Sequence, residues 1–110
     1  PIPSRGLGDV YKRQAKGGIE GFARSAAATY AKDNLRVNVI APSIMDSNMS
    51  QKILSSDTAR EVSKNMHPIS KIGNSDDILP VVKWLLSTDA QWVTGQTIHV
   101  DGGLSTVKPR

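Results

Sequence analysis

Apolar residues between positions 15 and 32 recur at the spacing of one face of a helix. They stand three and four positions apart, which is the period of an amphipathic helix, at Ile19, Phe22, Ala23, Ala26, Ala27, Tyr30 and Ala31. The pattern predicts a helix from about residue 15 to residue 32. Asp33 and Asn34 follow, and Asn tolerates the left-handed backbone conformation that commonly ends helices.

The next stretch predicts a strand followed by two short helices. Residues 35–41, LRVNVIA, are rich in β-branched side chains and stop at Pro42, which is typical of a buried strand. After a loop, residues 50–54 and 56–66 predict short helices, and Pro68 stops the second one.

The C-terminal third predicts one more helix and one more strand. Asn74 or Ser75 caps the helix, and Asp76 and Asp77 lie where the helix dipole favours negative charge. The predicted buried face of this helix consists of Ile78, Val81, Val82, Leu85 and Leu86. Residues 95–100, GQTIHV, predict the strand. Strand, helix and strand in this order form a right-handed βαβ unit, so the fold class is α/β.

Residues 1–14 show no apolar face, and Pro1, Pro3, Gly6 and Gly8 break any period. We therefore expect a disordered tail here. The segment SRGLGDVYKRQ, residues 4–14, resembles the translation of a transposase-based sequencing adapter in a single reading frame. This resemblance implies a non-native tail, with the native sequence starting at Ala15.

Composition excludes several classes of protein. The chain has no cysteine, so neither a disulfide nor a cysteine zinc site can form, and we expect a cytoplasmic protein. Residues 78–86 form the longest apolar run, which is far shorter than the roughly 20 residues of a membrane span. The N-terminus lacks the pattern of a signal peptide. The net charge is +4, and basic residues after Gln14 alternate with acidic ones. We therefore expect neither nucleic acid nor membrane as a partner.

Four stretches from Ala15 onward resemble the C-terminal part of the short-chain dehydrogenase/reductase family, of the 3-oxoacyl-carrier-protein reductase type. They are AKGGIEGFARSAA, LRVNVIAPSIMDSNM, HPISKIGNSDDI and VTGQTIHVDGG. Each motif is weak alone, but their order and spacing over residues 15–107 make the resemblance strong. It implies that residues 15–110 are part of an NAD(P)-binding domain, the second half of a Rossmann-like doubly wound parallel sheet.

The resemblance assigns Lys16 as a catalytic and cofactor-binding residue within the family pattern Y-x-x-x-K. Its tyrosine belongs at position 12, where this chain has Lys12. Tyr11 does not replace it, because a residue five positions back lies about 140° from Lys16 around a helix, against about 40° for four positions. The catalytic tyrosine is therefore expected to be missing. The alternative is that Lys16 is an ordinary surface lysine at a helix start.

The loop PSIMDSNM resembles the family's cofactor loop, P-G-x-I-x-T-x-M. The resemblance implies that the nicotinamide cofactor is contacted by Pro42, Ser43, Ile44, Met45 and Ser47. Ser43 stands where glycine is usual, so we expect a slightly strained or altered backbone there. The alternative is an ordinary turn after a strand, which uses similar residues.

Other candidates are weaker. His67 and His99 have no Cys or carboxylate neighbours at ligand spacing, so no metal site is expected. Met45, Met49 and Met66 either line an apolar substrate pocket or, as we favour, pack in the lid, the segment with the two short predicted helices between the strands. Trp84 and Trp92 are expected in the core or at an interface. Glycines that permit close approach, to a subunit partner or internally, are Gly17, Gly18 and Gly21.

The sequence thus predicts part of an oxidoreductase that transfers hydride between NAD or NADP and a small carbonyl or alcohol substrate. The 110 residues are expected to be inactive and to bind no cofactor tightly, because the catalytic tyrosine and serine and the glycine-rich phosphate loop are absent from them. The family resemblance implies a homo-oligomeric parent, often a tetramer. Two alternatives are a stand-alone oligomerisation or interaction module of the same fold and a basic binding protein with residues 1–14 as an arm.

Overall fold

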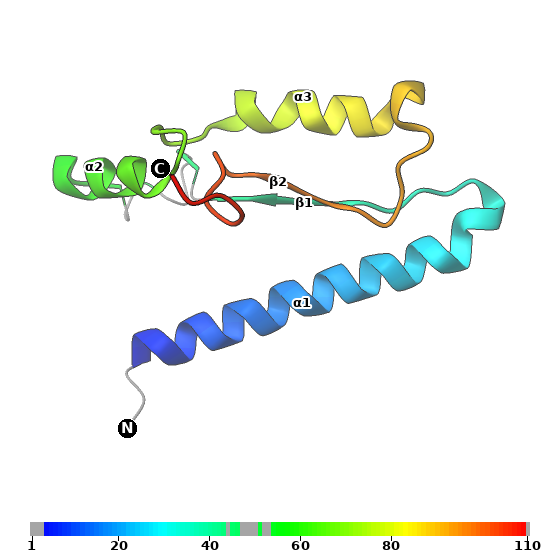
Figure 1. The fold of residues 1–110 in the computed structure, drawn as a ribbon, viewed down its shortest axis with the longest axis horizontal. Helices are drawn as coiled ribbons and strands as arrows, with labels where there is room; N and C mark the ends of the chain where they lie inside the picture. Colours follow the sequence, from blue (N-terminus) through cyan, green and yellow to red (C-terminus); the bar gives the residue numbers. More distant parts are fainter. Residues whose placement is uncertain (1–3, 44, 47–50, 52–53, 110) are drawn as a thin grey trace. The chain divides into compact units, whose positions relative to one another are not determined.

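The computed structural model describes residues 4–43, 45–46, 51 and 54–109 (Figure 1). The chain divides into a first unit, Pro1–Val39 with Gln91–Thr97, and a second unit, Ile40–Ala90 with Ile98–Arg110, and each is described by itself. The elements in order are α1 Ser4–Tyr30, η1 Ala31–Asp33, β1 Val39–Pro42, α2 Asp57–Met66, α3 Ser75–Leu86, η2 Thr88–Ala90 and β2 Thr97–Val100.

Helix α1 begins earlier than the sequence predicted. It starts at Ser4, whereas we expected a disordered tail up to residue 14. Residues 9–14 contain neither proline nor glycine, so the helix that follows can propagate back through them. Gly6 and Gly8 each cost about 1 kcal/mol relative to alanine, which the continuous helix absorbs. The structure thus differs from the predicted disorder over residues 4–14, while the foreign origin of this segment stays a prediction.

The predicted end of this helix is confirmed. After η1, Asn34 adopts the left-handed conformation with φ of 60°, and its amide donates to the Ala31 carbonyl oxygen at 3.0 Å. The Leu35 amide donates to the Tyr30 carbonyl oxygen at 3.2 Å. These bonds satisfy carbonyl groups that the last turn would otherwise leave without partners.

The buried face of α1 is narrower than the periodicity indicated. Ala23 and Ala27 are buried, at 6% and 5% exposure, whereas Ile19 and Phe22 are 58% and 77% exposed. Ala27 lies close to Gly95, because a Cβ added at Gly95 would stand 3.7 Å from the Ala27 Cβ. Small residues therefore make the described contact of this helix, and the large apolar ones lie outside it.

Three glycines of α1, Gly17, Gly18 and Gly21, make no close contact within the described part of the chain. A Cβ added at Gly17, Gly18 or Gly21 would meet nothing within 4 Å. Within the described residues, these glycines therefore show no internal packing partner. Contact with a second subunit stays a prediction.

The first unit is tied together by hydrogen bonds between residues 36–39 and residues 93–96. Val39 N donates to Gln96 O at 2.8 Å, and Gly95 N donates to Val37 O at 2.8 Å. The Asn38 side chain donates to Val93 O at 3.0 Å and accepts from Gln96 N at 3.1 Å. This register leads into β1 and β2, which form a two-stranded parallel sheet. The predicted strands are confirmed but shorter.

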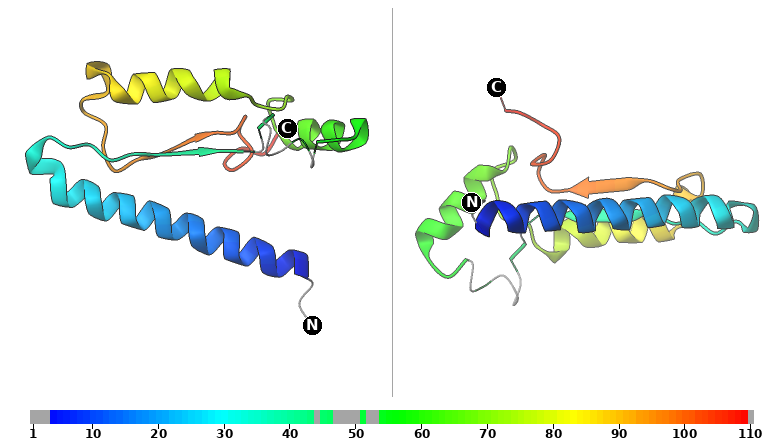
Figure 2. Two further views of the ribbon diagram at one scale, coloured as in Figure 1. Left: turned by 180° about the vertical axis from the view of Figure 1, so that it is seen from behind. Right: turned by 90° about the horizontal axis from the view of Figure 1, so that it is seen from below.

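In the second unit, α3 lies along the strand pair and α2 lies beyond its carboxyl ends (Figure 1 and Figure 2). Both helices have the predicted starts. Ser56 caps α2 by accepting from the Ala59 amide, and Asn74 caps α3 in a capping box with Asp77. The short helix predicted over residues 50–54 lies mostly outside the described residues.

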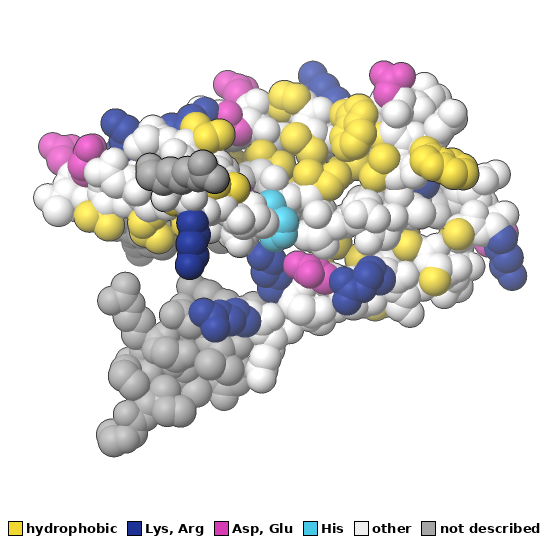
Figure 3. Space-filling view, in the orientation of Figure 1, with side chains coloured by type: hydrophobic (Ala, Val, Ile, Leu, Met, Phe, Trp, Pro, Cys, Tyr) yellow, Lys and Arg dark blue, Asp and Glu magenta, His cyan; other side chains and the backbone are white. Residues whose placement is uncertain are grey.

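The core of the second unit is small. Among its described residues, the buried apolar ones are Leu54, Leu85 and Ala90. Leu86 was predicted on the buried face of α3 but is 79% exposed. Hydrophobic side chains gather on the surface over α3 (Figure 3), where Trp84 is 41% exposed. Trp92, in the first unit, is 97% exposed, so neither tryptophan is a core residue of this chain.

Candidate functional site

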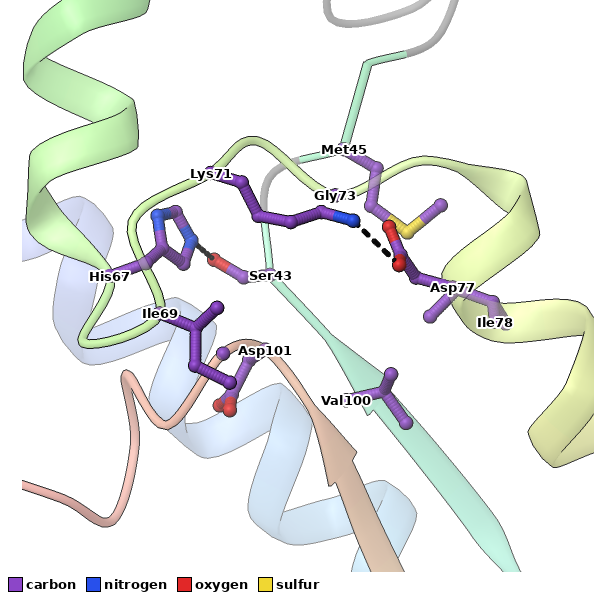
Figure 4. A pocket seen from close by; sticks show the side chains of 11 residues that line it. Ser43, Met45, His67, Ile69, Lys71, Gly73, Asp77, Ile78, Val100 and Asp101 are labelled. Carbon is purple, nitrogen blue, oxygen red and sulfur yellow. Dashed lines mark hydrogen bonds and ion pairs between the residues drawn. The ribbon is translucent and has the colours of Figure 1, made fainter.

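A pocket of about 310 Å³ lies in the second unit at the carboxyl ends of both strands. In open α/β sheets, ligands bind at this edge, beyond the strand ends. Residues that follow β1 and β2 line it together with the segment between α2 and α3 (Figure 4). The lining residues are Ser43, Met45, His67, Ile69, Lys71, Gly73, Asp77, Ile78, Val100, Asp101 and Gly102.

One side of the pocket is a hydrogen-bonded chain of three groups. His67 Nδ1 lies 2.6 Å from the Ser63 carbonyl oxygen, and His67 Nε2 lies 2.8 Å from Ser43 Oγ. A carbonyl oxygen only accepts, so Nδ1 carries a proton. In the neutral ring Nε2 is then an acceptor, and the Ser43 hydroxyl donates to it. His67 is 6% exposed, so its ring is largely shielded from water, whereas Ser43 is half-buried.

On another side, Lys71 and Asp77 form an ion pair with Nζ 2.7 Å from Oδ1 (Figure 4). The other oxygen of Asp77 accepts from the Asn74 amide at 2.9 Å. The hydrogen bond from Lys71, followed by that from the Asn74 backbone, lowers the pKa of the Asp77 carboxyl. The predicted role of Asp77 as a helix-start charge is confirmed by this capping box.

Asp101, directly after β2, lines the pocket and accepts the hydrogen bonds that hold the following turn together. Burial by itself raises the pKa of this carboxyl, but hydrogen bonds from the Ser105 hydroxyl and from the Gly103 and Ser105 amides outweigh burial and lower it. His99 Nδ1 lies 3.9 Å from Asp101 Oδ2. Gly102 and Gly103 have φ of 63° and 91°, which permits the tight turn that directs the Gly103 and Ser105 amides toward the Asp101 carboxylate.

The structure brings together two of the predicted loop residues. Ser43 and Met45 are half-buried and both line the pocket, whereas Pro42 is exposed at the end of β1. Ile44 and Ser47 lie outside the described residues. The strain expected at Ser43 is wrong, because among the described non-glycine residues Asn34 alone has a positive φ. Serine therefore replaces glycine at this position without a left-handed backbone.

Lys16 belongs to the first unit, where it is exposed on α1. Helix α1 is continuous through residues 11–16, so the two positions lie about 140° apart around the helix, as assumed when Tyr11 was excluded as the catalytic tyrosine. Position 12, one turn before Lys16, carries Lys12. Because the two units are described separately, the catalytic role of Lys16 stays a prediction.

The structure describes two of the three methionines that were candidates for a substrate pocket. Met45 lines the pocket and forms a parallel β-bridge with Gly73. Met66 is 52% exposed, at a shallow depression along α2. Met49 lies outside the described residues. Substrate contact by Met45 stays a prediction.

Sequence reasoning missed the role of His67, which it considered only as a metal ligand. The partner of this side chain, Ser43, lies 24 positions away in the sequence, so no local sequence pattern indicates the contact. Across the part of the chain that the structure describes, no three His, Cys, Asp or Glu side chains cluster as a metal site would require. None of the described helices is long and apolar enough to cross a membrane.

A protein-family model described as Enoyl-(Acyl carrier protein) reductase matches residues 8–105. Nodulation protein G of Rhizobium sp. (strain N33) is 38% identical over 93 residues, covering 84% of this chain and 37% of the relative. The 3-oxoacyl-[acyl-carrier-protein] reductase FabG of Haemophilus influenzae is 37% identical over 90 residues, covering 82% and 36%. The chain thus spans little more than a third of the length of these relatives.

Two solved structures extend the similarity to three dimensions. A 4-hydroxyisoleucine dehydrogenase complexed with NADH superposes with a TM-score of 0.80 at 25% identity, covering 86% of this chain and 39% of that one. A 3-oxoacyl-[acyl-carrier protein] reductase from Brucella melitensis superposes with a TM-score of 0.75 at 30% identity, covering 84% and 34%. Both likenesses include most of the elements described above.

Proposed function

The chain belongs to the short-chain dehydrogenase/reductase family, a family of oxidoreductases with a Rossmann fold, and on this premise we propose that it is part of an enzyme that transfers hydride between NAD or NADP and a small carbonyl or alcohol substrate. The observation that carries the proposal is the pocket at the carboxyl ends of β1 and β2. The loop resembling the family's cofactor loop contributes Ser43 and Met45 to this pocket.

The residues present fit a nicotinamide cofactor. Pro42 ends β1, and Met45 adds a soft apolar wall beside Ile78 and Val100, suited to the flat face of a nicotinamide ring. When bound, the cofactor supplies or accepts the hydride. The Lys16 ammonium would hold the ribose and favour the ionised form of a tyrosine one turn earlier. That tyrosine would exchange a proton with the carbonyl oxygen of the substrate.

The proposal is tested in the enzyme restored by joining the upstream coding sequence at Ala15. We expect a tyrosine four positions before Lys16 and NADH- or NADPH-dependent reduction of a carbonyl substrate. Lys16→Ala should lower kcat/KM by roughly 100-fold or more, because positioning and tyrosine activation fail together. Lys32→Ala, which removes another exposed lysine, is the matched control and should leave the rate within about twofold. Normal turnover by the Lys16→Ala enzyme would remove Lys16 from the site.

We also propose that the 110-residue chain is catalytically inactive, with residues 4–14 foreign to the parent protein. The supporting observation is Lys12 at the position of the family's tyrosine. An amine at that position does not offer the phenol proton that the reaction uses. Titration with NADH and NADPH, followed by fluorescence, should show no saturable binding. A Kd in the micromolar range would contradict this.

The alternative is a stand-alone oligomerisation module with the family fold. The observation that favours it is the exposed apolar face of α1, including Ile19 and Phe22. The same face fits the proposal that the parent enzyme is a homo-oligomer. Genomic sequence upstream of Ala15 separates the two functions. A start codon with native codons for residues 1–14 supports the module, whereas an open frame carrying a glycine-rich loop supports the enzyme.

A further inference from the structure

The His67 side chain connects the end of α2 to the loop after β1. His67 is the C-cap residue of α2, and its backbone amide donates to the Lys64 carbonyl oxygen at 3.3 Å. Its ring reaches a second carbonyl of the same turn, that of Ser63. Two carbonyl groups that the helix end leaves open are thus satisfied by one residue. The ring is consequently held in place relative to α2 by a bond that does not involve Ser43.

The loop after β1 is held to the segment that follows α2 at two places. At its first residue, Ser43 donates to His67. Further along, the Asp46 amide donates to the Gly73 carbonyl oxygen at 2.7 Å, and Met45 pairs with Gly73 as a parallel bridge. The Asp46 carboxylate also forms an exposed ion pair with Arg60 of α2, at 3.0 Å. The loop and the 67–73 segment are therefore linked at both ends of the described loop.

Ser43 makes this link through its hydroxyl, and its backbone has no left-handed φ. A glycine at this position could not donate such a bond, because it has no side chain. The serine therefore lacks glycine's conformational freedom but supplies a specific hydrogen bond to His67. This hydrogen bond depends on the tautomer of His67 that the Ser63 carbonyl selects.

We infer that His67 is a positioning residue for the loop that carries Ser43 and Met45. The α2 end fixes the ring, the ring accepts the Ser43 hydroxyl, and the loop start is held at one wall of the pocket. In the parent enzyme this loop would meet the nicotinamide cofactor, so that part of the inference rests on the proposed function. The Ser43–His67 link itself does not depend on a bound cofactor.

Two substitutions of His67 separate its two hydrogen bonds. His67→Asn keeps a donor near the position of Nδ1 for the Ser63 carbonyl but removes the acceptor for Ser43. His67→Gln offers an acceptor near the position of Nε2. Hydrogen exchange of the Asp46 amide, measured by NMR in the 110-residue chain, reports how firmly the loop is held.

We expect Ser43→Ala and His67→Asn each to speed Asp46 exchange by roughly 2- to 10-fold, the range of one neutral hydrogen bond. The double variant should be no faster than either single variant, because both remove the same bond. His67→Gln should restore at least part of the protection. Ser70→Ala is the matched control, since it removes a serine hydroxyl bonded to Asn65 in the same segment and should leave Asp46 exchange unchanged.

Unchanged exchange in His67→Asn, or effects of the two single variants that multiply in the double variant, would overturn the inference. The same cycle in the restored enzyme gives the answer if the chain alone exchanges too fast to follow. There, His67→Asn should raise KM for the cofactor by roughly 2- to 10-fold, and His67→Gln should restore at least part of the affinity. An enzyme that uses no nicotinamide cofactor, yet shows the exchange pattern, would refute the proposed function and leave the positioning role intact.

Discussion

In the first unit, small residues make the described contact of helix α1, whereas in the second unit polar side chains hold the walls of the pocket. Ala27 of α1 approaches Gly95, and residues 36–39 bond to residues 93–96 through both main-chain and side-chain groups. Around the pocket, by contrast, Ser43, His67, Lys71, Asp77 and Asp101 each use a side-chain atom to fix a neighbouring segment. The packing of α1 on Gly95 should therefore be sensitive to side-chain size, and the pocket walls to loss of individual polar atoms.

The largest effect should come from adding a side chain at Gly95. Its φ of 72° is a conformation that β-branched residues rarely adopt, and its missing Cβ faces Ala27. Gly95→Val should lower the free energy of unfolding by about 3 kcal/mol, measured by urea denaturation. Gly21→Ala is the opposite control. It lies in open space within α1 and should stabilise the chain by about 1 kcal/mol. Equal stability of Gly95→Val and the wild type would show that neither the left-handed φ nor the contact with Ala27 restricts this position.

A smaller effect should follow the loss of one carboxylate in the second unit. Asp101→Asn replaces Oδ2, which accepts from the Ser105 amide and hydroxyl, by an NH2 group, and it should destabilise the chain by about 2 kcal/mol at pH 7. The pKa of Asp101 is lower in the folded chain than the unfolded value of about 4. Its contribution is therefore complete above that value and is lost as the pH falls through the folded pKa.

The two proteins should consequently approach equal stability as the pH drops below about 4. Urea denaturation between pH 7 and pH 3 measures this convergence. Asp89→Asn, at an exposed aspartate in η2, should show little difference at any pH. A constant gap between Asp101→Asn and the wild type down to pH 3 would rule out this role of the carboxylate.

The smallest effect should come from an exposed ion pair. Arg60 and Asp46 lie 3.0 Å apart, with both side chains 41% exposed. Arg60→Gln should cost about 0.5 kcal/mol or less in the free energy of unfolding, and 0.5 M salt should abolish the difference. A cost above about 1 kcal/mol would mean that this pair holds the loop more strongly than solvent exposure permits.

The parts of the fold that sequence predicted well have their cause in neighbouring residues. Asn74 and Asp77 form a capping box within one turn, and Asn34 ends a helix through its own backbone preference. The predicted helix start was wrong because the apolar period, which begins near Ala15, marks a buried face and not the end of the helix. Residues 9–14 contain neither proline nor glycine, and the helix continues through Gly6 and Gly8 to Ser4.

The candidate site was predictable to the extent that it follows strand ends. Ser43 and Met45 were expected in the loop after β1, and the structure places both at the pocket. The resemblance suggested strain at Ser43 because it compares residue types and not backbone angles. The contact with His67 depends on where α2 ends in space, which the local patterns of one sequence do not specify.

Asp77 divides its two oxygens between different tasks. One accepts from the Asn74 amide at the start of α3, and the other holds Lys71 at the pocket wall. Positions 71 and 77 are therefore coupled through their side chains, whereas any residue except proline at position 74 supplies the same backbone donor. A change at position 71 or 77 is tolerated best with a matching change at the other. In related chains these two positions should vary together, and a library that randomises them jointly should yield more folded variants than one that varies each alone.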